Sequence, residues 1–410
     1  MQSTPPDSRH DGMTKTAFIT GANGISGSAL VEHLCNTTTP DDWSSIIVTS
    51  RSAFKPPPTV TDPRITFVAL DFLHDVPSLV KQMQEVCRPV THAYFCSYLH
   101  KDDFSEAYAA NTALFEHFLV ALDQTAPHLQ NVTLQTGGKY YNLHVEPVPS
   151  PARENDPRRH GPLQNFYFPQ EGLLAQMSQR SGGYSGSVSS HDDKAKPARW
   201  SWNVVRPQAI IGANAQPLGL NMGLTMAVYF LICRELGTEA PMPTNRRYWE
   251  GADDATYAPL IADLAAFVST RRECANEAFN VANGDAFCWR DMWPRIAASL
   301  GARADSEQGF EKPAPDEGGE LQLDGWGFGE WCRDKRAVWD ELCERQGLPG
   351  AKTTFDLAGW EIGDFLFRRT WSATLSVDKA RRYGWTGHID SYEAFTRTFD
   401  KFRELGLIPR

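Results

Sequence analysis

The sequence predicts an α/β protein with a doubly wound parallel sheet. Short apolar strand patterns alternate with helical patterns in the first half of the chain, and the first strand pattern runs through a glycine-rich turn directly into a helical one. One more strand pattern recurs well downstream, at 277–282. Such alternation is typical of parallel sheets, because each return to the same edge of the sheet requires a crossover connection.

The strand patterns are rich in Ile, Val, Phe and Thr. They lie at 16–20, 45–50, 65–70, 92–96, 132–135, 202–206 and 277–282. Apolar residues at helical spacing cover 25–35, 76–87 and 104–124, and a long apolar helical pattern covers 218–233. We expect the Gly- and Ser-rich stretch at 180–199 to be a surface insertion, and the acidic stretch at 303–320 to be a loop.

The order of these patterns predicts two interleaved domains in the 410 residues. We expect a disordered tail at 1–13, an NADP-binding Rossmann domain at 14–212 to which 251–283 returns, and a smaller, mainly helical substrate-binding cap made of 213–250 and 284–410. Only Trp43 of the 12 tryptophans precedes position 200, so most of the aromatic bulk belongs to the second half.

Composition argues against several classes of protein. The net charge of −10 argues against a nucleic-acid or anionic-membrane partner, and no apolar run is long enough to cross a membrane. The polar N-terminus lacks a secretory signal pattern, and the 8 scattered cysteines suggest neither a metal site nor a disulfide framework. We therefore expect a metal-free cytoplasmic protein.

A glycine motif follows the first strand pattern. Gly21, Gly24 and Gly27 have the spacing G-x-x-G-x-x-G at the start of the first helical pattern. Such glycines allow a tight turn and the close approach of a pyrophosphate to a helix N-terminus, whose dipole favours negative charge. A purely structural turn is the alternative, but the strand-turn-helix context favours a dinucleotide site that includes Asn23 and Ile25.

The end of the second strand pattern distinguishes NAD from NADPH. A carboxylate at this position would accept a hydrogen bond from the ribose 2′-hydroxyl of NAD, whereas this chain has Ser50, Arg51 and Ser52. Arg51 can pair with a 2′-phosphate, so NADPH is favoured over Arg51 being a solvated surface residue. Asp41 and Asp42 precede the strand and should lie at its opposite end.

The third strand pattern ends at Asp71 and Phe72, which are candidate cofactor contacts. Asp71 is a plausible partner of the adenine, and an ordinary strand-end cap is the alternative.

The catalytic Tyr-x-x-x-Lys pattern of short-chain dehydrogenases is absent. Tyr167 is followed at that spacing by Glu171, and Tyr140 by His144. Either the fold is not catalytic, or the acid and its lysine come from separate segments. Lys139 follows the fifth strand pattern, at the sheet edge where ligands bind in open α/β folds, and Tyr167 precedes a helical pattern.

Several segments resemble the progesterone 5β-reductase/iridoid synthase-like (PRISE) family, a divergent branch of the short-chain dehydrogenases. TGGKYY at 136–141 is similar to the family's TGRKHY, and NFYF at 165–168 is similar to its NFYY. The stretches at 202–212, 279–293 and 376–390 also resemble family stretches, and the resemblance extends over about 15–410. Gly138 and Phe168 depart from the family pattern.

The resemblance implies an NADPH-dependent oxidoreductase that performs 1,4-reduction of the C=C bond of an enone or enal. The substrate class is a bulky, apolar terpenoid, steroid or polyketide-like carbonyl compound. Tyr167 and Lys139 match the catalytic pair, in which the tyrosine hydrogen-bonds the enolate oxygen and the lysine lowers the pKa of the tyrosine. Both residues, with Thr136, are also candidate cofactor contacts, and the resemblance suggests a homodimer.

The substrate pocket has candidates in both halves of the chain. They are Val145, Phe168, Asn221, Met222 and Met226, and less decisively Trp360, Phe365, Phe367 and Trp371. Core packing is the alternative for the apolar residues among them.

Two other functional classes are compatible with these residues. One is a non-redox isomerase or cyclase that uses Tyr167 and Lys139 as acid and base while the nucleotide is structural. The other is a nucleotide-sensing protein without chemistry, against which the presence of Lys139 and Tyr167 argues.

Overall fold

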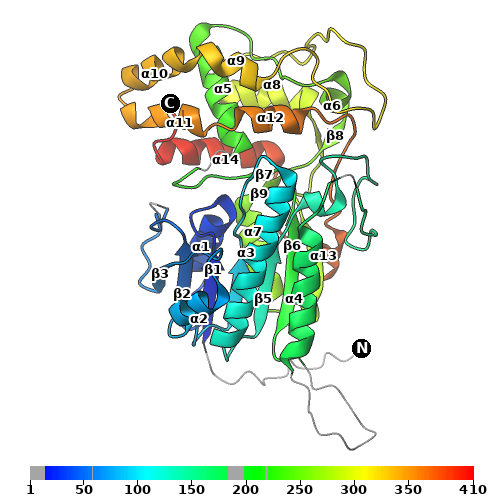
Figure 1. Cartoon of the computed structure of the whole chain (residues 1–410). Helices are drawn as coiled ribbons and strands as arrows, with labels where there is room; N and C mark the ends of the chain where they lie inside the picture. Colours follow the sequence, from blue (N-terminus) through cyan, green and yellow to red (C-terminus); the bar gives the residue numbers. More distant parts are fainter. Residues whose placement is uncertain (1–13, 58, 162, 183–197, 218–219) are drawn as a thin grey trace, which may run out of the picture.

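The computed structural model describes residues 14–57, 59–161, 163–182, 198–217 and 220–410. The expected tail at 1–13 and most of the expected insertion at 180–199 lie outside these ranges. Figure 1 shows a sheet flanked by helices, with a second group of helices gathered at one end of the strands.

Seven strands form the central sheet in the order β10-β6-β5-β4-β1-β2-β3, and every neighbouring pair is parallel. They are β1 (Lys15–Thr20), β2 (Trp43–Ser50), β3 (Ile65–Ala69), β4 (His92–Phe95), β5 (Asn131–Gln135), β6 (Ser201–Pro207) and β10 (Glu277–Val281). The predicted strands and the doubly wound Rossmann fold are thus confirmed. The order reverses between β1 and β4, which is where open α/β sheets leave a crevice for ligands.

Both faces of the sheet are covered by helices (Figure 1). Helices α1 (Ile25–Thr37) and α7 (Ala258–Ser269) share one apolar core with Ala17 and Ile19 of β1. The opposite core contains Phe18 and is closed by α2 (Val76–Met83), α3 (Phe104–Thr125) and α4 (Tyr167–Ser181). Alternate residues of one strand therefore feed opposite cores, as the pleat requires.

The cap lies beyond the carboxyl ends of the strands (Figure 1). It contains α5 (Met222–Leu236), α6 (Arg246–Glu250), α8 (Trp289–Ser299), α9 (Phe328–Trp331), α10 (Arg336–Arg345), α11 (Thr354–Leu357), α12 (Trp360–Phe367) and α14 (Ser391–Glu404). Their shared core includes the tryptophans 249, 289, 293, 326, 331, 339 and 360. The tryptophan-rich half of the sequence thus builds the cap.

Helix α5 is the centre of the cap, and every residue from Gly223 to Cys233 is buried. It begins at Met222, later than the apolar pattern at 218–233, because the Asn221 side chain accepts a hydrogen bond from the Leu224 N–H and caps the helix. Gly237, with φ of 67°, ends it.

The remaining elements are short. They are β7 (Ile210–Ile211), β8 (Ala252–Asp253), β9 (Thr256–Tyr257), β11 (Phe287–Cys288), α13 (Asp378–Arg382) and 3₁₀ turns at Gly138–Tyr141, Arg272–Cys274, Cys332–Asp334 and Pro349–Thr353. The acidic stretch at 303–320 contains no helix, in agreement with the prediction of a loop.

Within the predicted cap range 284–410, the segment around α13 and Trp385 lies outside the cap. Ala380 of α13 and Trp385 are buried in the core beneath α1 and α7. The Trp385 indole N–H donates to Asp263 of α7 over 2.6 Å. This segment therefore packs on the sheet domain, because its apolar side chains complete the core beside β10.

All eight cysteines are free thiols. Within the described ranges, no group of His, Cys, Asp and Glu side chains is arranged to hold a metal ion. The helices described there are all too short or too polar to span a bilayer.

Candidate active site

A cavity of about 1480 Å³ separates the sheet from the cap. Residues that follow β1, β2, β4 and β5, among them Gly21, Arg51, Tyr98 and Lys139, form one side, and α5 and α12 form the other. Pockets for one small ligand are typically about 300–1,000 Å³, so this cavity has room for a dinucleotide and a second molecule.

The glycine turn is shaped by close contacts within the fold. Gly21 has φ of 64°, and a Cβ there would lie 2.8 Å from the Cys96 carbonyl oxygen. A Cβ at Gly27 would lie 2.2 Å from the Gly21 carbonyl oxygen. Gly21 and Gly24 line the cavity, whereas Gly27 does not. This glycine lets α1 pack against the turn, and its contact with the cofactor stays a prediction.

The N-terminus of α1 fits an anionic group. Gly24 is its N-cap and provides no side chain to accept from the first-turn N–H groups, whereas Asp75 caps α2 and Asp103 caps α3. Gly24, Ile25 and Ser26 all border the cavity. Uncapped N–H groups at the positive end of a helix are a suitable site for a pyrophosphate.

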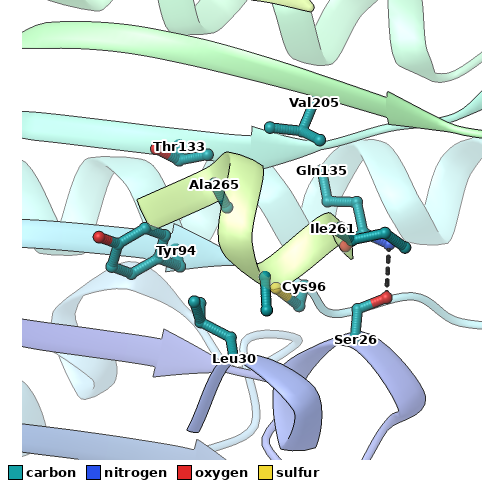
Figure 2. Close-up of a pocket in the computed structure, with 10 residues that line it drawn as sticks. Ser26, Leu30, Tyr94, Cys96, Thr133, Gln135, Val205, Ile261 and Ala265 are labelled. Carbon is teal, nitrogen blue, oxygen red and sulfur yellow. Dashed lines mark hydrogen bonds between the residues drawn. The ribbon is translucent and has the colours of Figure 1, made fainter. Parts of the chain in front are cut away.

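Figure 2 shows a smaller gap behind this turn, between the sheet, α1 and α7. The Gln135 side-chain N–H donates to the Ser26 hydroxyl over 2.9 Å and joins the end of β5 to α1. The gap has a volume of only about 10 Å³ and an apolar lining that includes Leu30 and Ile261. It is a packing gap, since a single water needs about that volume together with polar partners.

Asn23 organises the loop after β2. Its amide donates to the hydroxyls of Ser50 and Ser52 over 3.0 and 3.2 Å, and its oxygen accepts the Lys55 N–H over 3.0 Å. Arg51 lies on this loop, lines the cavity and has no ion-pair partner among the described residues. Asn23 and the serines thus hold the loop that carries a free guanidinium.

Asp71 and Phe72 both line the cavity. The Asp71 carboxylate accepts the Leu73 N–H over 3.0 Å, which is the strand-end cap that the sequence left open as an alternative. The Phe72 ring is fixed edge-on against Phe118, with centroids 5.4 Å apart. Asp41 and Asp42 precede β2, at the end of the sheet away from the cavity.

Asn165 brings the two predicted catalytic segments together. Its amide donates to the Lys139 carbonyl over 2.6 Å, and its side-chain oxygen accepts the Tyr167 N–H over 3.1 Å. Lys139 lies in the 3₁₀ turn after β5, and Tyr167 is the first residue of α4. Both side chains line the cavity, as does Thr136.

The environment of Tyr167 keeps its hydroxyl protonated. The side chain is buried against Gly137, and a Cβ on that glycine would lie 3.6 Å from the hydroxyl oxygen. Burial raises the pKa of Tyr167 above its usual range, with smaller contributions from Tyr98 and Glu171. Lys139 is not among the groups that shift this pKa, so its expected effect on Tyr167 stays a prediction. Glu171, the residue in place of the usual lysine, forms a buried ion pair with Arg206 over 2.7 Å.

Tyr98 was not predicted from the sequence. It follows β4 and lines the cavity, and its hydroxyl lies 3.4 Å from the Lys139 Nζ. The rule that ligands bind beyond the carboxyl ends of strands pointed to this loop. No residue pattern distinguished Tyr98 from the other aromatic residues.

Three of the five substrate-pocket candidates line the cavity, namely Asn221, Met222 and Met226. Phe168 and Val145 do not. The Phe168 ring packs edge-on against Tyr140, with centroids 5.3 Å apart, because successive helical residues point about 100° apart and Tyr167 takes the cavity side. Val145 lies in the turn after Asn142, outside the cavity lining.

The cap wall is mainly aromatic. Trp360, Phe365 and Phe367 line it, whereas the Trp371 indole is buried elsewhere and donates to the Leu143 carbonyl over 3.1 Å. The polar residues in this wall include Asp253, Asp254 and Arg369, and His144 lines the cavity from the sheet domain.

Comparison with known proteins agrees with this architecture. Residues 17–409 match the PRISE-like Rossmann-fold domain. The chain is 71% identical to the short chain dehydrogenase gsfE of Penicillium aethiopicum, over 97% of this chain and all of that protein. It is 28% identical to the (S)-8-oxocitronellyl enol synthase ISY1 of Nepeta cataria and to the 3-oxo-Delta(4,5)-steroid 5-beta-reductase of Arabidopsis thaliana, in each case over 96% of this chain and 93% of the relative.

A solved structure shares the fold at low identity. The Bordetella bronchiseptica enzyme WbmG, in complex with NAD, superposes with a TM-score of 0.60 at 14% identity, over 97% of this chain and 96% of that one. The chain is thus an oxidoreductase of the short-chain dehydrogenase superfamily, and within that superfamily it belongs to the PRISE-like Rossmann-fold family.

Proposed function

We propose that the chain reduces the C=C bond of an enone or enal with NADPH, in a bulky and mainly apolar natural product. The observation that carries the proposal is a single cavity with three kinds of wall. A glycine turn and uncapped helix end lie on one side, the Tyr167 hydroxyl and Lys139 ammonium lie at the sheet edge, and α5 and α12 form an apolar wall.

The free guanidinium of Arg51 supports NADPH rather than NADH. The loop after β2 places this cation in the cavity lining and offers Ser50 and Ser52 where NAD-binding folds use a carboxylate. Arginine pairs strongly with phosphate oxygens through two parallel hydrogen bonds. When bound, the reduced nicotinamide supplies the hydride for the β-carbon of the substrate.

Tyr167 serves as a neutral hydrogen-bond donor in this reaction. As the β-carbon receives the hydride, the electron pair of the C=C bond shifts toward the carbonyl, and negative charge develops on the oxygen. A hydroxyl whose pKa is raised keeps its proton at neutral pH and stabilises that charge by donation. The α-carbon then takes one proton from solvent, which completes the addition of a hydride and a proton.

The cap supports an apolar substrate. Met222, Met226, Trp360 and Phe365 face the cavity, and thioether and aromatic side chains hold apolar ligands of irregular shape. The names of the two plant relatives, an oxocitronellyl enol synthase and a steroid 5-beta-reductase, are consistent with this substrate class.

The test follows NADPH absorbance with a panel of cyclic and acyclic enones and enals, for the wild type and Tyr167→Phe. We expect oxidation by at least one bulky enone, and a loss of kcat of about 10²–10³-fold in Tyr167→Phe with unchanged NADPH affinity. Tight NADPH binding without oxidation by any substrate would contradict the proposal. A product of unchanged mass would instead identify an isomerase or cyclase.

A further inference from the structure

We propose that Tyr98 is a second catalytic hydroxyl, which donates to the same substrate oxygen as Tyr167 and through which Lys139 acts. The inference rests on the proposed reduction and deepens it, since it assigns the two hydrogen bonds that the developing enolate receives. Its basis is the juxtaposition of three side chains from three separate segments, which follow β4, follow β5 and begin α4.

The backbone places Tyr98 beside Tyr167. Tyr98 follows β4, the strand next to β1 at the reversal of strand order. Its ring packs against Phe166 with centroids 6.0 Å apart, and Phe166 packs against Tyr167 at 4.6 Å. Tyr98 is also among the groups that raise the pKa of Tyr167, so the two phenols interact electrostatically.

The two hydroxyls differ in exposure. Tyr98 is 36% exposed and Tyr167 is 9% exposed, yet both line the same cavity. Tyr98 therefore presents its hydroxyl to an incoming molecule at the open side of the pair, while Tyr167 does so from the buried side.

The hydrogen bond from Lys139 leaves the Tyr98 proton available. The Lys139 ammonium is 3.4 Å from the Tyr98 hydroxyl oxygen, and an ammonium has only hydrogens to give, so the tyrosine oxygen is the acceptor. The hydroxyl hydrogen of Tyr98 has no acceptor among the described residues and is free to bind a ligand oxygen. Hydrogen bonds in a chain polarise one another. The bond from the Lys139 ammonium therefore makes the Tyr98 hydroxyl a stronger donor.

Lys139 has no such link to Tyr167. Over the described ranges of the chain, no hydrogen bond joins the two side chains, whereas the ammonium also lies 5.6 Å from the Tyr98 ring centre. Lys139 therefore polarises the hydroxyl of Tyr98, whereas burial keeps the hydroxyl of Tyr167 protonated. Two donors directed at one oxygen form an oxyanion hole.

The experiment is a double-mutant cycle at saturating NADPH, with an enone that the wild type reduces. Tyr98→Phe keeps the ring on Phe166 and removes only the hydroxyl, and Lys139→Met removes the ammonium but keeps the stem. We expect Tyr98→Phe and Lys139→Met each to lower kcat by about 10²-fold. The kcat of the variant that carries both changes should lie within threefold of the lower of the two single-variant values. Tyr98→Phe combined with Tyr167→Phe should lose more than either alone.

Two controls separate a catalytic role from a structural one. Tyr383→Phe removes a hydroxyl that lies beside β10 and outside the cavity lining, and it should keep wild-type kcat. NADPH affinity of Tyr98→Phe, measured by fluorescence, should stay within twofold of the wild type. A Tyr98→Phe kcat within twofold of the wild type, or losses for Tyr98 and Lys139 that multiply, would overturn the inference.

A binding measurement distinguishes failure of this inference from failure of the proposed function. In the presence of NADP⁺, 4-nitrophenol serves as an enolate mimic whose absorbance separates phenol from phenolate. We expect the wild type to bind it with a larger phenolate fraction than Tyr98→Phe, because two donors stabilise the anion. Equal spectra overturn the role of Tyr98 whether or not any enone is reduced, whereas a lack of enone reduction with unequal spectra contradicts only the reductase proposal.

Discussion

The sheet edge and the cap wall face the same cavity but differ in whether their charged side chains form ion pairs. At the sheet edge, Arg51 and Lys139 have no carboxylate partner among the described residues. In the cap wall, the Asp253 carboxylate accepts from the Tyr248 hydroxyl, the Trp289 indole and the Arg369 guanidinium, over 2.6, 2.9 and 2.8 Å. The unpaired charges of Arg51 and Lys139 are available to bind ligands, whereas the paired charges around Asp253 hold the shape of the pocket wall.

The largest effect that tests this contrast is expected from Asp253→Asn. Asp253 is buried and the Arg369 side chain is only 11% exposed, so the variant leaves a largely desolvated guanidinium without its counter-charge in the cap. Breaking one partner of a buried pair typically costs about 3–5 kcal/mol. Chemical denaturation should therefore show a loss of that size in the free energy of unfolding.

The neighbouring Asp254 provides the matched control. Burial, followed by the charge of Asp253, raises the pKa of Asp254 well above its usual range, which favours the neutral form of its carboxyl group. Asp254→Asn keeps an oxygen for the Leu375 N–H, now 2.6 Å from Oδ2, and should change the free energy of unfolding by less than about 1 kcal/mol. A carboxyl group whose pKa is raised in the folded protein costs stability as pH rises above its unfolded value of about 4. The free energy of unfolding of the variant should therefore fall less with rising pH than that of the wild type. Equal losses for the two asparagine variants would contradict the distinction.

The sequence predicted the sheet domain more completely than the cap. Strand residues such as Ala17, Phe18 and Ile19 form a short apolar run that is recognisable within a few positions. Gly21 indicates a turn because glycine readily adopts a positive φ. These are local signals, so the strands and the cofactor loop were found. For the cap, the apolar pattern at 218–233 predicted a helix but not its orientation, because α5 is buried on all sides and has no polar face.

The features of the site that the sequence did not reveal have the same origin. The contact between Tyr98 and Lys139 joins loops 41 residues apart, which no local pattern encodes. The high pKa of Tyr167 arises from burial beside Gly137, which becomes visible only once α4 is docked. Phe168 adjoins Tyr167 in sequence but points away from the cavity, since the phase of a helix depends on its packing.

A smaller effect tests the sheet edge. Arg51→Ala should weaken NADPH binding by about 10–100-fold, since hydrogen bonds to charged groups contribute about 1.5–3 kcal/mol. NADH affinity and the free energy of unfolding should be unchanged, because Arg51 supports no other described group. Fluorescence titration with both nucleotides measures the preference. The control is Lys55→Ala, which removes a positive charge from the same loop outside the cavity lining. An equal loss of NADPH affinity in this variant would indicate a long-range electrostatic effect of the loop rather than a direct contact between Arg51 and the phosphate.

The smallest effect concerns His144, where the two regions meet. Its Nδ1 is buried and has no hydrogen-bond partner among the described residues, and its ring lies 6.4 Å from Phe365 of the cap. Burial, assisted by the positive charge of Lys139, lowers the pKa of His144 to about 3. The folded protein therefore keeps His144 neutral, whereas the unfolded chain binds a proton near pH 6.5.

This difference makes stability depend on pH with a definite sign. The folded pKa lies below the unfolded value, so the contribution of His144 is fully present above pH 6.5 and is lost as pH falls toward 3. His144→Gln has no imidazole to protonate, so between pH 7 and pH 5.5 its free energy of unfolding should fall by about 1 kcal/mol less than that of the wild type. Lys139→Met should lie between the two, because it removes the charge and leaves the burial. Parallel losses in all three proteins would mean that the ring accepts a proton in the folded state, and that the sheet edge tolerates a second cation beside Lys139.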